Sequence, residues 1–158
     1  MNETSTPARG LRAGDAVADV WDLVSIYDGG DRFLADLAAI PEAKRHLLVA
    51  LWCDREIVNG GFLQLFWNST GVLVPEAPAA YRALGLDDAA TLFETVLGHF
   101  ARPYPRDRGP RRQTFTLLPG RDYPLRGQFD SLDDAYYARL PKDEFGRVVD
   151  AYAERHVI

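Results

Sequence analysis

The sequence predicts an all-α fold, namely a single-domain irregular bundle of about seven or eight helices with a long loop rich in proline and arginine. Apolar residues recur at helical spacing over most of the 158 residues, and glycine pairs and prolines separate the periodic segments. Hydrophobic residues make up 47% of the chain, which is enough for a conventional core. Residues 1–13 are polar and are expected to form a flexible N-terminal tail, which leaves residues 14–158 as the domain.

The first two helices are expected over residues 15–28 and 31–40. In the first, valines fall on one side of a helix while aspartates fall on the other. The pair Gly29-Gly30 is expected to end it. In the second, apolar residues such as Phe33 recur every three or four positions. Both segments are therefore predicted to be amphipathic helices that pack on the core.

The longest helix is expected over residues 41–58. Pro41 suits the first turn of a helix, where its missing N–H has no partner to lose. The sequence Asn59-Gly60-Gly61 is expected to end this helix and reverse the chain, because glycine tolerates positive φ. A short helix is then expected over residues 62–68.

The remaining helices carry their own start and stop signals. Pro75 suits a first turn, and Gly85 suits a helix end. Asp87 and Asp88 are expected to cap the helix that follows them. These helices are predicted over residues 75–84, 87–100, 131–140 and 143–156.

Residues 101–128 are predicted to form a long loop, because they hold five prolines, three glycines and seven arginines and show no period. Residues 114–118 are interpreted as extended chain within it. A long loop in a compact domain is often functional, and arginine and aromatic residues are enriched at protein interfaces. The candidate loop interface comprises Tyr104, Arg106, Arg108, Arg111, Arg112 and Phe115.

The charge of the chain is unevenly distributed. The net charge is −5, and residues 101–126 hold seven arginines and two aspartates, a balance of +5, so the rest of the chain carries −10. An acidic body should avoid nucleic acid, because phosphate contacts need clustered cations. Ordinary solvated helix faces are an alternative interpretation of the acidic residues. The candidate acidic binding face comprises Asp15, Asp19, Asp22, Asp28, Asp31 and Asp36.

The chain offers little for catalysis or metal binding. Cys53 is the one cysteine and lies in an apolar stretch, so we expect a core residue and a reducing compartment, the cytoplasm. His46, His99 and His156 lie far apart, whereas metal ligands are usually closely spaced. We find no secretory signal and no membrane span. No catalytic residue, cofactor or metal is therefore expected.

Residues 56–71, EIVNGGFLQLFWNSTG, form the most informative segment. Phe62 and Phe66 lie at helical spacing and are expected to pack inward. Gln64 and Asn68 lie four residues apart, where their amides are expected to satisfy unpaired backbone groups of the neighbouring turn. The segment is interpreted as a helical corner that builds the fold more than it contacts a partner.

The same segment resembles a family of helical proteins that includes a bacterial DNA-mimic protein. The resemblance covers about residues 42–155, including Pro75-Glu76, residues 105–107 with Arg111 or Arg112 after them, and residues 132–137. It implies an all-α homodimer without cofactor or catalysis, whose acidic surface imitates the DNA backbone and binds a transcription factor. The matching residues in the central segment are Glu56, Asn59, Gly60, Gly61, Phe62, Gln64, Phe66, Asn68 and Gly71.

The function predicted from the sequence is that of a non-enzymatic protein-binding module, a cytoplasmic bacterial homodimer that acts as an acidic DNA mimic and sequesters a DNA-binding regulator. It is expected to bind neither nucleic acid nor membrane. The arginine-rich loop is expected to repel a DNA-binding partner wherever the two are adjacent. One alternative is a general interaction or immunity-type partner that uses residues 101–128. Another is an enzyme with an unrecognised site around Glu56, Asn59, Gln64 and Asn68.

Overall fold

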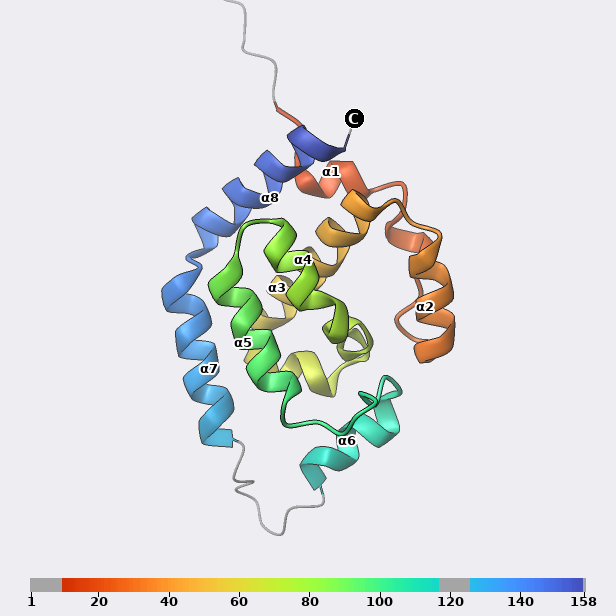
Figure 1. Ribbon diagram of the computed structural model, residues 1–158, viewed down its shortest axis with the longest axis vertical. Coiled ribbons are helices and arrows are strands. Elements are labelled where there is room, and N and C mark those ends of the chain that lie inside the picture. The colour runs from red at the N-terminus through yellow and green to blue at the C-terminus, as the bar shows by residue number, and fades with distance from the viewer. Residues whose placement is uncertain (1–9, 117–125, 158) are drawn as a thin grey trace, which may run out of the picture.

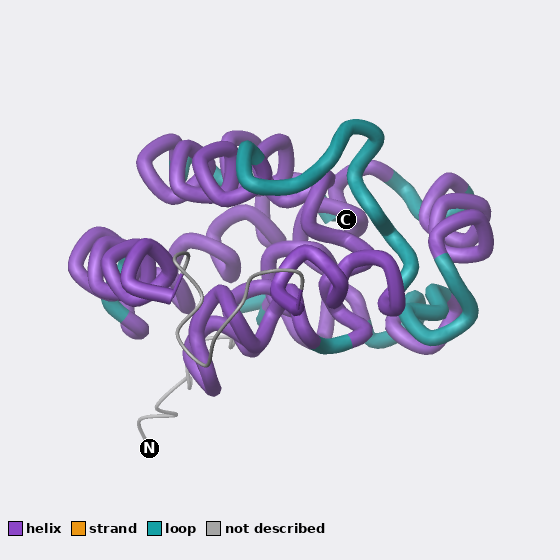
Figure 2. The backbone as a smooth tube through the Cα atoms, turned by 90° about the horizontal axis from the view of Figure 1, so that it is seen from below, coloured by secondary structure: helices purple, strands orange, loops and turns teal. Residues whose placement is uncertain are grey.

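The computed structural model describes residues 10–116 and 126–157, and it confirms the all-α bundle. All regular structure in these residues is helical, and loops join the helices (Figure 1, Figure 2). None of the described helices is both long and apolar enough to cross a membrane. The α-helices are α1 (Ala13–Val17), α2 (Gly30–Ala38), α3 (Glu42–Trp67), α4 (Ala77–Ala83), α5 (Asp87–Leu97), α6 (Arg108–Thr116), α7 (Arg126–Arg139) and α8 (Lys142–His156), and the 3₁₀ helices are η1 (Trp21–Leu23) and η2 (Ser69–Glu76).

Helix α3 runs through the middle of the bundle. It contacts α1, α4, α6, α7, α8 and η2, and Figure 1 shows α5, α7 and α8 along one side of the molecule with α2 on the other. Its apolar side chains are buried along both halves, among them Leu47, Ile57 and Phe66. An all-round contact surface of this kind needs apolar residues on several faces. The other helices are therefore positioned by how they pack on α3.

The continuous helix predicted over residues 15–28 is wrong. Helix α1 ends at Val17, and after a turn the chain forms only the three-residue helix η1. Val17, Val20 and Val24 are all buried, so their spacing correctly indicated which residues face the core, although the helix between them is broken. Val24 is extended, with φ −112° and ψ 112°, as β-branched residues readily are. The first three predicted acidic residues consequently do not share one helix face.

The loop predicted over residues 101–128 is wrong for residues 108–116, which form α6, and for residues 126–128, which begin α7. Gly109 and Pro110 lie in the first turn of this helix, where proline is tolerated. The mean polarity of α6 is high, and it docks through the buried guanidinium of Arg111, so no apolar period marked it. Residues 114–116, predicted as extended chain, are helical. Residues 117 and 118, the rest of that stretch, lie outside the described residues.

Two smaller predictions about helix starts also need correction. Asp87 and Asp88 lie in the first turn of α5, and its N-cap position is Leu86 without a side-chain hydrogen bond. Their charge stabilises the helix N-terminus electrostatically and not as a cap. Pro75 belongs to η2, so α4 starts at Ala77.

Candidate functional site

Helix α3 is kinked at Gly60 and Gly61, the glycines expected to end it. Gly61 has φ 74°, a region that favours glycine, and a Cβ there would lie 2.2 Å from a carboxylate oxygen of Asp133. Asp133, from α7, accepts the Phe62 N–H at 2.7 Å. Partial burial raises the pKa of Asp133, while the bond from Phe62 lowers it. The carboxylate thus caps the second half of α3 from a neighbouring helix.

The kink brings two side-chain amides back to Glu56. Its carboxylate accepts hydrogen bonds from Gln64 Nε2 at 2.8 Å, Asn68 Nδ2 at 3.1 Å and Thr70 Oγ1 at 2.7 Å. The expectation that the two amides satisfy backbone groups is therefore wrong, because they serve a carboxylate instead. Three neutral donors hold this group in one orientation. Thr70, in η2, was missed because its partner lies fourteen residues earlier in the sequence.

The C-terminal end of α3 is capped by a buried arginine from α6. Arg111 donates from Nε to the Phe66 carbonyl at 2.7 Å and from Nη2 to the Asn68 carbonyl at 2.7 Å, and its Nη1 also donates to the Arg106 carbonyl. Burial lowers its pKa, yet an arginine keeps its charge in a protein. The last carbonyls of a helix lack intrahelical partners and attract cations. A Cβ at Gly71 would lie 2.5 Å from the Arg111 Nε, so glycine leaves room for this guanidinium.

Other residues of the predicted loop interface also face inward. Arg106 pairs with Glu76 through both terminal nitrogens, at 2.6 and 2.9 Å, and donates to the Val72 carbonyl. The Tyr104 hydroxyl donates to the Gly71 carbonyl at 2.8 Å. Arg112 lies over the Trp67 ring, 4.3 Å from its centroid, and donates to the Trp67 carbonyl. Of the six predicted interface residues, Arg108 is exposed, and the side chain of Phe115 lies outside what the structure describes.

The six predicted acidic residues differ in their surroundings. Asp36 is 12% exposed at its side chain and pairs with Arg32 at 2.7 Å, which lowers its pKa. Asp19 pairs with Lys44 at 2.6 Å, and this bond lowers its pKa. The other four are exposed, and within the described residues no salt bridge neutralises them. These four are Asp15, Asp22, Asp28 and Asp31.

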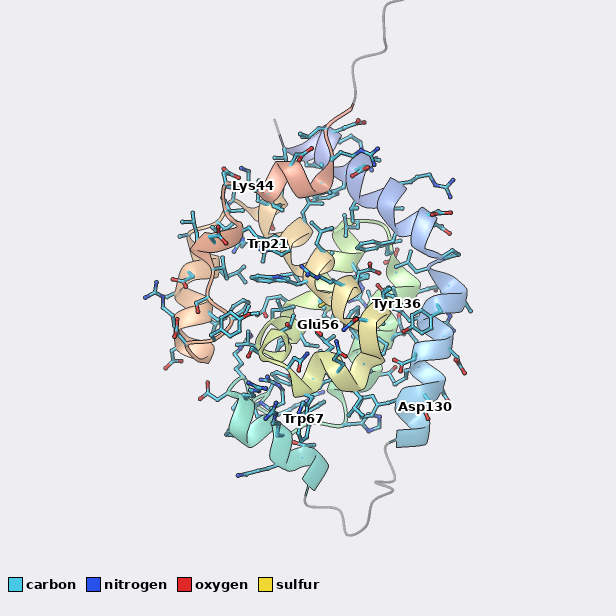
Figure 3. All side chains as sticks on the ribbon, turned by 180° about the vertical axis from the view of Figure 1, so that it is seen from behind. Trp21, Lys44, Glu56, Trp67, Asp130 and Tyr136 are labelled. Carbon is cyan, nitrogen blue, oxygen red and sulfur yellow. The ribbon has the colours of Figure 1, made fainter. Side chains whose placement is uncertain are left out.

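A hollow of about 1060 Å³ lies between residues 21–27 and α3. Figure 3 shows Glu56 on this face, with Trp21 reaching from the segment before α2. The polar residues of the sequence motif all line the hollow, whereas its phenylalanines are buried in the core. The motif is therefore both a structural corner and the wall of a cavity. The lining residues from the motif are Glu56, Asn59, Gln64 and Asn68.

A buried tyrosine pair reaches the same wall from behind. The Tyr136 hydroxyl donates to Asp54 Oδ1 at 2.8 Å and lies 2.8 Å from the Tyr81 hydroxyl. Burial raises the pKa of both tyrosines well above the usual range. These side chains come from α3, α4 and α7, and sequence spacing alone did not connect them. The one sequence feature that pointed toward them is the pair of adjacent tyrosines, Tyr136 and Tyr137, in the segment 132–137.

The cysteine and the histidines are placed as ordinary structural residues. The Cys53 thiol is fully buried, and burial raises its pKa well above the usual range, which disfavours the nucleophilic thiolate. Within the described residues, no group of three or more histidine, cysteine, aspartate or glutamate side chains is placed to hold a metal ion. His46 Nδ1 lies 2.9 Å from the Tyr152 hydroxyl, and the ring of His156 packs against the same tyrosine, with the two ring centroids 4.4 Å apart.

Comparison with known proteins identifies the family. The comparisons with curated proteins and with solved structures gave no match. A family model described as DMP19-like protein matches residues 38–156, which is most of the chain and close to the extent of the resemblance seen in the sequence. This family is that of the DNA-mimic proteins and is generally non-enzymatic. The chain belongs to the DMP19-like protein family.

Proposed function

We propose that the protein is a non-enzymatic binding module that presents an acidic surface to a DNA-binding regulator and competes with DNA for it. Membership of the DMP19-like family supports this proposal. From the same resemblance we propose that it acts as a homodimer and needs no cofactor, and from the single cysteine we propose that it is cytoplasmic. Because fold and function separate easily, the surface of this chain has to support the same conclusion.

The observation that carries the proposal is that two arginines of the predicted loop, which were expected to repel a basic partner, bond within the protein. Arg111 is completely buried, and Arg106 forms a partly buried pair with Glu76. The net charge of the chain is −5, and the charge of Arg106 is compensated locally by Glu76, while the guanidinium of Arg111 is out of reach of a partner surface. The expected repulsion of a basic partner is thereby reduced. The four exposed aspartates that form no salt bridge among the described residues are available to a cationic surface, namely Asp15, Asp22, Asp28 and Asp31.

The alternative based on residues 101–128 receives less support. An interface residue has to be accessible, but Arg111 is not exposed, and Arg106 and Tyr104 are bound to η2. Their bonds hold α6 and the preceding loop against the end of α3. We infer that these residues chiefly maintain the fold.

Capture from cytosol tests the proposal. The immobilised protein should retain a basic DNA-binding protein, and a variant with asparagine at the four exposed aspartates should retain much less. A control variant loses the same four charges elsewhere, through exposed residues Asp88, Asp130, Asp134 and Glu154 changed to their amides. Recovery of no DNA-binding protein argues against the function, and equal loss in both variants argues against the acidic face.

A further inference from the structure

The fold does not explain the hollow beside Glu56, whose lining includes Asp22 of the proposed acidic face. Its volume of about 1060 Å³ is at the upper end for small-ligand pockets. One wall is the middle of α3, and the other is the irregular segment over residues 21–27. That segment holds the short helix η1 and irregular chain.

Aromatic rings form the apolar part of the lining. Trp21 and Trp52 approach from opposite walls, with ring centroids 4.9 Å apart and planes inclined by 58°. Tyr27, at the rim, is 79% exposed, and Val58 is 46% exposed. Tyr27 is the exposed ring among the described lining residues, and an exposed ring beside a hollow favours a ligand that covers it, whereas Trp21 and Trp52 are half-buried. Indole is also the side chain that attracts cations most strongly.

Carboxylates form the polar part. Asp54 and Glu56 project from α3, and each is held by hydrogen bonds from within the protein. Asp22, from the facing wall, is exposed and has no hydrogen bond or ion pair among the described residues. Arg55 is the one cation among the described lining residues, so three carboxylates leave an excess of two negative charges. Anionic ligands are disfavoured by this excess, and an uncharged ligand leaves it uncompensated.

We propose that this hollow binds a guanidinium group, namely an arginine side chain of the protein partner. A guanidinium is planar, stacks on aromatic rings and donates to carboxylates in a fork, whereas a lysine ammonium does not stack. Proteins that read DNA present such arginines to base edges and phosphates. This inference rests on the proposed function, and it gives the polar residues of the family motif a role at the surface.

The direct test is a titration with N-acetyl-arginine amide, followed by the indole N–H signals in two-dimensional NMR. The signals of Trp21 and Trp52 should shift and saturate, while that of Trp67, which lies under Arg112 outside the hollow, should not. N-acetyl-citrulline amide has the same shape without the charge, and it should bind about tenfold more weakly. Equal affinity for the two amides, or equal shifts of all three indoles, overturns the proposal.

A pair of variants gives the matched control. Asp22→Asn should weaken binding of the arginine amide at least about threefold, because an exposed ion pair is lost. Asp130→Asn removes the same charge from α7, away from the hollow, and should leave the affinity unchanged (Figure 3). Equal effects of the two variants would show a general charge effect and overturn the assignment.

The two proposals fail in distinguishable ways. If a regulator is captured equally well by wild type and Asp22→Asn, the hollow has no part in partner binding, and the proposed function stands. If the arginine amide binds at Trp21 and Trp52 but no DNA-binding protein is captured, the proposed function fails, and the hollow is a guanidinium site without that partner.

Discussion

Replacement of Arg111 with methionine should destabilise the fold strongly, although Arg111 bonds to backbone carbonyls and forms no ion pair with a carboxylate. The side chain is fully buried and donates two 2.7 Å hydrogen bonds to carbonyls at the end of α3. A hydrogen bond to a charged group contributes about 1.5–3 kcal/mol, so the two bonds contribute about 3–6 kcal/mol. Removing a buried charge also returns part of its desolvation cost. We therefore expect a net loss of about 2–4 kcal/mol.

The assay for Arg111 is urea unfolding followed by circular dichroism at 222 nm. With a slope of about 2 kcal/mol per molar urea, the midpoint should fall by about 1–2 M. Arg112→Met is the matched control, because Arg112 makes one exposed hydrogen bond and one cation–π contact and should lose much less stability than Arg111→Met. If the two variants lose the same stability within about 0.5 kcal/mol, Arg111 does not cap α3 as described.

Three further predictions concern stability and are read out by the same urea unfolding. Gly61→Ala should lower the free energy of unfolding by about 1–3 kcal/mol, and by more than Gly85→Ala does. Both glycines have positive φ, but only at position 61 does the new Cβ meet a carboxylate. Equal losses in the two variants would contradict this close approach. Glu56→Ala should cost about 1–3 kcal/mol, because three donors lose their acceptor, and a cost below about 0.5 kcal/mol would show that water replaces it. Burial lowers the pKa of His46 from its ordinary 6.5, so the unfolded chain takes up a proton that the folded protein does not, and stability should fall as the pH drops below about 7 toward the folded pKa. The His46→Gln variant should lack this fall in stability. If its stability still depends on pH as in the wild type, another group causes the effect.

The sequence predicted what depends on local pattern. The end of the straight part of α3 at Gly60 and Gly61 could be predicted, because these residues tolerate backbone angles that others avoid. The segment before α2 could not, since buried valines at helical spacing look alike in a helix and in a short irregular turn. Helix α6 was missed because its docking depends on one buried guanidinium and not on an apolar stripe.

The candidate site was predicted only in part, for a similar reason. The motif singled out Glu56, Gln64 and Asn68, but their mutual contact depends on how far α3 turns at the kink. The other wall of the hollow comes from residues 21–27, which lie 29 to 35 positions before Glu56. No spacing rule links the two walls, because tertiary packing alone brings them together.

Competition between this protein and DNA for a captured regulator tests the central claim most directly. The regulator is bound to a labelled duplex carrying its site, and the protein is added while the fraction of bound duplex is followed by anisotropy. We predict that the wild-type protein releases the duplex, and that the variant with asparagine at Asp15, Asp22, Asp28 and Asp31 needs a much higher concentration. A ternary complex in which regulator, duplex and this protein are bound together would contradict the account.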